Sequence, residues 1–85
     1  MSRLIPAAER IQRARALIQK ARKYPLPADG NKFDLTFIAE VKDILRQARD
    51  LVKFIPDTPS ATSEIKEEVK KIFEEIEMAN REILH

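Results

Sequence analysis

The sequence predicts an all-α fold, an antiparallel up-down-up three-helix bundle formed by a single domain over residues 1–85. Three segments repeat apolar residues at intervals of three and four, which places these residues on one face of a helix. Proline-containing stretches separate the segments, and a composition with 44% apolar and 35% charged residues is typical of a folded helical protein. The connections between the segments are short, and this favours antiparallel neighbours.

The first helix is predicted over about residues 3–23, and Pro25 and Pro27 then prevent its continuation. Its apolar face consists of Leu4, Ala7, Ile11, Ala14, Ile18 and Ala21. The second helix is predicted over about residues 32–55. A first apolar row on it comprises Phe37, Val41, Ile44, Ala48, Leu51 and Ile55, and a second row comprises Ile38, Leu45 and Val52.

Capping residues mark the predicted ends of the second and third helices. Asn31 is the expected N-cap of the second helix with Asp34 as its capping-box partner, and Pro56 follows its end. Thr58 is the expected N-cap of a third helix over about residues 59–84, with Pro59 in its first position. The apolar face of this helix comprises Ile65, Val69, Ile72, Ile76, Ala79 and Ile83.

Charge is distributed unevenly along the chain. Residues 1–23 contain seven basic residues and one acidic residue, whereas residues 58–85 contain four basic and seven acidic residues. We therefore expect the basic first helix to lie beside the acidic third helix, with ion pairs that favour this arrangement over others.

The residue inventory excludes most kinds of catalytic chemistry, so we predict no enzyme, no catalytic residue, no metal site and no cofactor. The chain has no cysteine, its only histidine is His85 and its only glycine is Gly30. A catalytic triad, a zinc site and a glycine-rich phosphate loop each need residues that are absent. The apolar runs are too short to cross a bilayer and no signal peptide is visible, so we expect no membrane partner and a cytoplasmic location, natural or recombinant.

Two binding functions remain as alternatives. The arginine-rich first helix could bind nucleic acid, although a net charge of +2 and the lack of interleaved aromatic residues argue against it. The broad apolar face of the second helix could instead serve a natural adaptor from a thermophile, since richness in Glu and Lys is typical of thermophilic proteins.

One short segment points to a third function. The residues Asn31-Lys32-Phe33-Asp34-Leu35-Thr36 resemble Asn-Trp-Phe-Asp-Ile-Thr, the start of the membrane-proximal external region of the human immunodeficiency virus envelope transmembrane subunit. That region is a helix recognised by broadly neutralising antibodies, and it has been transplanted onto helical proteins as epitope scaffolds. The resemblance implies partner-binding roles for Asn31, Phe33, Asp34 and Thr36, whereas Lys32 replaces an aromatic antibody anchor.

Local and global signals agree in the three apolar repeats and their caps, as in designed proteins. The proline-rich first loop and Leu26 depart from an idealised design, which a partly redesigned natural scaffold would explain. The segment 64–76 alternates Glu and Lys with Ile and Val in a regular binary pattern. We therefore expect a non-catalytic, engineered or redesigned helical scaffold. It would be a thermostable monomer that presents a helical face to a protein partner, which on the resemblance is an antibody.

Overall fold

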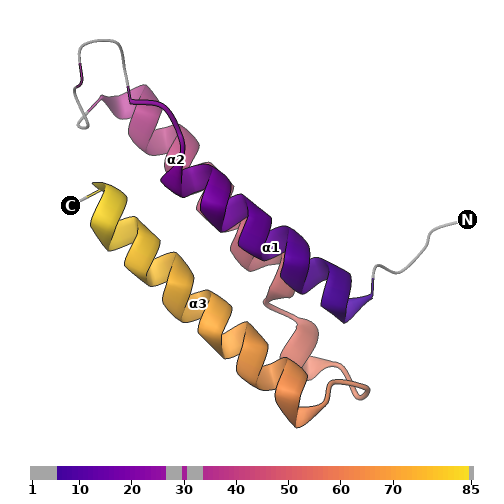
Figure 1. Cartoon of the computed structure of the whole chain (residues 1–85). Coiled ribbons are helices and arrows are strands. Elements are labelled where there is room, and N and C mark those ends of the chain that lie inside the picture. Colours follow the sequence, from indigo (N-terminus) through magenta and orange to yellow (C-terminus); the bar gives the residue numbers. More distant parts are fainter. Residues whose placement is uncertain (1–5, 27–29, 31–33, 85) are drawn as a thin grey trace, which may run out of the picture.

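A computed structural model of the chain describes residues 6–26, 30 and 34–84. Within them lie three α-helices, α1 (Ala7–Arg22), α2 (Leu35–Val52) and α3 (Ser63–Leu84), with the short 3₁₀ helix η1 (Ile55–Asp57) after α2. Successive helices run in opposite directions, and each contacts the other two (Figure 1). The predicted all-α, antiparallel three-helix bundle is thereby confirmed.

Helix α1 begins directly after Pro6, whose extended ψ of 147° prevents that residue from joining the helix. The sequence placed the start near residue 3, and residues 3–5 lie outside the described part of the chain. At the other end, the Lys23 and Tyr24 amides donate hydrogen bonds to Gln19 and Ala21, and Pro25 follows. The predicted end of this helix is therefore confirmed to within one residue.

Helix α2 is shorter at both ends than the predicted range of about 32–55. The Asp34 carboxylate accepts a hydrogen bond from the Phe37 amide at 3.0 Å, so Asp34 is the N-cap and the helix begins at Leu35. Asn31, the expected cap, lies outside the described residues. The helix ends at Val52 because Pro56, four residues later, has no amide proton and its ring would collide with the Val52 carbonyl.

The predicted start of the third helix at Thr58-Pro59 is wrong, because Thr58 does not cap that helix. Its hydroxyl donates to the Ile55 carbonyl at 2.7 Å and closes η1, and a turn follows. Thr62 is the residue that caps α3, because its hydroxyl accepts a hydrogen bond from the Ile65 amide at 3.2 Å. Thr62 lies four residues after Thr58 and closer to Ile65, where the apolar repeat begins.

Among the described residues, the core is made only of apolar side chains from the predicted repeats. None of the described polar or charged residues is buried, and the described part of the chain has no buried side-chain nitrogen or oxygen without a hydrogen-bond partner. Tyr24 closes the end of the bundle near the start of α2 by packing its ring against Phe37, with centroids 6.0 Å apart. The buried residues are Ile11, Ala14, Ile18, Ala21, Phe37, Val41, Ile44, Leu45, Ala48, Val52, Ile55, Val69, Ile72 and Ala79.

Ion pairs connect the basic α1 to the acidic α3, as the charge distribution predicted. Arg15 lies 2.7 Å from the Glu68 carboxylate and 4.0 Å from that of Glu75, and Arg22 pairs with Glu82 near the other end of both helices. These side chains are partly exposed, so water and salt screen the attraction. Their main contribution is to select which helices lie side by side.

The Arg15–Glu68 pair gives a test of this arrangement by pH titration. The hydrogen bond and charge of Arg15 hold the pKa of Glu68 below its ordinary value. Because the folded-state pKa is the lower one, the stabilisation is present above the ordinary carboxyl pKa and is lost as the pH falls through the folded-state value. We expect Arg15→Gln to raise the Glu68 pKa, measured by carboxyl-carbon NMR titration. An unchanged titration would show that the two helices do not pair in solution through these residues.

Candidate protein-binding surface

The first turn of α2 is the described part of the segment that resembles the viral epitope. Asp34 is half-buried and uses its carboxylate to cap the helix, whereas Leu35 and Thr36 point to solvent. Of the four predicted contact residues, Asp34 and Thr36 are thus adjacent at one end of the bundle. Asn31 and Phe33 lie outside the described residues.

Leu35 is the most exposed large apolar side chain in the described structure, with 83% of its surface accessible. It precedes the core residue Phe37 by two positions and therefore lies about 200° around the helix from it. Ala39, one turn further on, is also exposed on this side. The surface formed by Leu35, Thr36 and Ala39 is called the first-turn surface below.

Leu35 was not among the predicted contact residues, although the sequence contained a signal for it. Its position falls outside both apolar rows of α2, so no buried neighbour could be assigned to it. A leucine without a place in the core exposes apolar area to water without a compensating contact. A single exposed apolar residue is common on protein surfaces. Leu35 is considered as a contact residue only because Thr36 and the capping residue Asp34 lie beside it.

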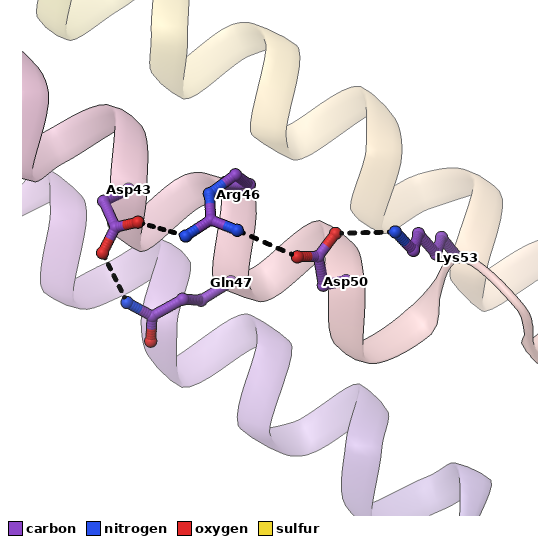
Figure 2. Close-up of polar contacts among 5 residues, drawn as sticks. All are labelled: Asp43, Arg46, Gln47, Asp50 and Lys53. Carbon is purple, nitrogen blue, oxygen red and sulfur yellow. Dashed lines mark hydrogen bonds and ion pairs between the residues drawn. The ribbon is translucent and has the colours of Figure 1, made fainter.

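The outer side of α2 changes from apolar to charged after the first-turn surface. Arg46 pairs with Asp43 and lies 3.4 Å from Asp50, and Lys53 lies 3.1 Å from Asp50 (Figure 2). Gln47 donates to the second oxygen of Asp43 at 2.9 Å. These contacts join residues three and four positions apart, which is the spacing that brings side chains together on a helix surface.

The contact between Arg46 and Asp43 favours the ionised form of both residues. Hydrogen bonds from Arg46 and then Gln47 hold the pKa of Asp43 below its ordinary value. The same bond from Arg46 to Asp43 raises the pKa of the arginine. A general acid or base needs a pKa near the working pH, and both shifts move away from neutrality. The polar contacts among Asp43, Arg46, Gln47, Asp50 and Lys53 therefore form a hydrated border to the first-turn surface.

The broad apolar face of α2, which suggested an adaptor, belongs mostly to the core. Phe37, Leu45 and Val52 are buried within the monomer, and Ile38 is half-buried against the same core. Most of that face is therefore covered within the monomer. The adaptor alternative therefore receives less support from this face, although Ile38 is not wholly buried.

The arginine-rich flank of α1 is largely engaged with other groups. Arg15 and Arg22 pair with α3, Arg13 lies 3.0 Å from Glu9, and Arg10 donates to the Leu51 carbonyl at 3.3 Å. Phosphate groups would have to compete with these contacts. Nucleic-acid binding through α1 therefore receives less support than the sequence alone offered it.

The described part of the chain has no metal-binding cluster beside these surfaces. Over residues 6–26, 30 and 34–84, no three His, Cys, Asp or Glu side chains are grouped so that they could ligate a metal ion. Within the same ranges, none of the helices combines the length and the hydropathy that crossing a bilayer requires. Comparison with known proteins gives no matching family model, no similar curated protein and no similar solved structure.

Proposed function

We propose that this protein is a non-catalytic, engineered or redesigned helical scaffold that presents the start of α2 to a protein partner. The observation that carries this proposal is the exposure of Leu35 and Thr36 beside the capping residue Asp34. A hydrogen-bonded cap and a rigid helix hold both side chains in one geometry before a partner arrives. Such preorganisation lowers the entropy cost of binding.

The segment resemblance makes an antibody against the membrane-proximal external region the specific candidate partner. Leu35 and Thr36 stand where that epitope has an isoleucine and a threonine, and Phe33 and Asp34 match it exactly. The departure is Lys32, where the epitope has tryptophan. Since buried tryptophan often dominates such interfaces, we propose that this chain binds those antibodies weakly and is either the parent of a scaffold or a variant tuned for other antibodies.

The variant Lys32→Trp tests this proposal. Restoring the aromatic anchor is expected to strengthen binding of an antibody specific for the Asn-Trp-Phe-Asp-Ile-Thr segment by at least about tenfold, because a buried tryptophan commonly contributes about 2 kcal/mol or more. In the Lys32→Trp background, Phe33→Ala is expected to reverse most of that gain. Biolayer interferometry with the immobilised antibody measures both changes.

Lys71→Trp provides a matched control, because Lys71 is an exposed lysine on α3 and lies outside the segment 31–36. It should leave antibody affinity unchanged. Equal gains from Lys32→Trp and Lys71→Trp would indicate non-specific hydrophobic adhesion. Unchanged affinity for Lys32→Trp and for Phe33→Ala would remove the start of α2 from any such interface and overturn the antibody proposal.

A further inference from the structure

Helix α3 leaves part of its apolar face incompletely covered. Of its 22 residues only Val69, Ile72 and Ala79 are buried, whereas the shorter α2 buries six. Phe73 and Ile76 are half-buried against the core. Two helices are therefore too few to cover the apolar surface that α3 presents.

The uncovered strip lies between α3 and α2, where the surface is hollowed. Two adjoining hollows of about 320 and 290 Å³ share Arg49, Ile76 and Glu77 as lining residues. Leu45, Phe73 and Ile76 supply the apolar lining, and Lys42, Arg46 and Arg49 lie along the α2 side. We refer to this feature as the α2–α3 groove.

The α2 side of the groove is basic and retains unpaired charge. Arg46 is engaged by Asp43 and Asp50, but neither Lys42 nor Arg49 has a carboxylate within 4.0 Å among the described residues. The only acidic side chain among the described residues that line the groove is Glu77, and it lies 3.9 Å from Arg81.

The α3 side adds further basic residues along the same line. Lys66 and Lys70 precede Phe73 by seven and three positions, so they fall on the same flank of the helix. Both are exposed, and neither has a carboxylate within 4.0 Å in the described structure. Basic residues thus border the apolar strip from both helices.

We propose that the α2–α3 groove binds an amphipathic helix of a protein partner whose apolar stripe is bordered by Asp and Glu. An apolar stripe would cover Phe73 and Ile76, and its flanking carboxylates would reach Lys42 and Arg49. The partner helix would complete a four-helix bundle. Because these cations are exposed, their pairing would orient the partner helix and raise its association rate, and salt would weaken the attraction.

Charge also discriminates against other occupants of the groove. A second copy that paired through the same groove would bring the basic border against itself, and like charges repel. A nucleic acid would satisfy the cations but leave the apolar lining without a contact. The proposed interface shares no residue with the first-turn surface. The groove proposal therefore goes beyond the proposed function, and each of the two can be tested independently of the other.

The test uses a fluorescein-labelled peptide of about three heptads, with Leu at the a and d positions and Glu at the e and g positions. Fluorescence anisotropy is measured with the full chain at low and at high salt. We expect saturable binding that weakens with salt, because exposed ion pairs are screened. A second peptide, with Lys in place of each Glu, should bind at least about tenfold more weakly, since it would face the basic border with like charge.

Charge-reversal variants locate the binding site on the protein. Lys42→Glu combined with Arg49→Glu is expected to weaken binding of the acidic peptide about tenfold or more, from the loss of attraction and the added repulsion at two sites. Lys20→Glu combined with Lys23→Glu changes net charge equally on exposed positions of α1 and should change affinity less than about twofold. Circular dichroism melting verifies that both variants are folded.

Three results would overturn the proposal. The first is no saturable binding of the acidic peptide, and the second is equal weakening by the groove and the α1 variants, which would indicate a general charge effect. The third is displacement of the peptide by a single-stranded oligonucleotide at equal total charge, which would indicate simple polyanion attraction. The antibody experiment concerns residues 31–36, so neither test decides the other.

Discussion

Replacing Ile72 by alanine is expected to lower the free energy of unfolding by about 2–5 kcal/mol. Ile72 is completely buried in the middle of α3, where it is one of the largest side chains without contact to solvent. Alanine removes its buried methyl and methylene groups and leaves a cavity that the helices cannot fill by small movements. Denaturant unfolding followed by circular dichroism measures the change.

The size of this effect matters because domains of this length have little stability to lose. A chain of 85 residues is expected to have an unfolding free energy of about 4–13 kcal/mol, so one substitution could remove a third or more of it. Met78→Ala on the same helix is the control, since 52% of the Met78 surface is already exposed. It should cost less than about 1 kcal/mol. Equal losses for the two variants would contradict the assigned faces of α3.

Replacing Ala14 by leucine is expected to destabilise the bundle by about 1–3 kcal/mol. Ala14 is fully buried and lies between Ile11 and Ile18 on the core face of α1. A larger side chain at a close-packed position must push the neighbouring helices apart or adopt an unfavourable rotamer. The free energy of unfolding, again from denaturant titration, should fall accordingly.

Ala16 gives the matched control for Ala14, because it lies on the same helix and is exposed. Ala16→Leu introduces the same side chain with nearly the same helix propensity, and it should change stability by no more than about 0.5 kcal/mol. A large loss for Ala16→Leu together with none for Ala14→Leu would show that α1 turns its other side to the core.

The apolar repeats predicted the fold and the core because helical periodicity is a local property of the sequence. Ile11, Ile18, Val41 and Val69 are all buried as their positions in the repeats required. Helix ends were predicted less well, because neighbouring residues with suitable side chains compete to cap the same helix end. At the start of α3 the capping residue is Thr62, whereas the Thr58 hydroxyl donates a hydrogen bond to the Ile55 carbonyl.

The candidate surfaces depended more strongly on the tertiary structure. The sequence identified Asp34 and Thr36 through a resemblance, but it did not identify Leu35 as the most exposed apolar side chain beside them. Nor did it identify the α2–α3 groove. Both features are set by how much of each helix its neighbours cover, and coverage depends on the positions of all three helices together.

By itself, the sequence determined three amphipathic helices, their antiparallel order and the pairing of basic α1 with acidic α3. The tertiary structure decided which of two threonines caps α3, and it left Phe73 and Ile76 half-covered beside Lys42 and Arg49. The physical reason is that periodicity and net charge act over a few turns of one helix. Exposure of a side chain is fixed only when residues distant in the sequence pack against it.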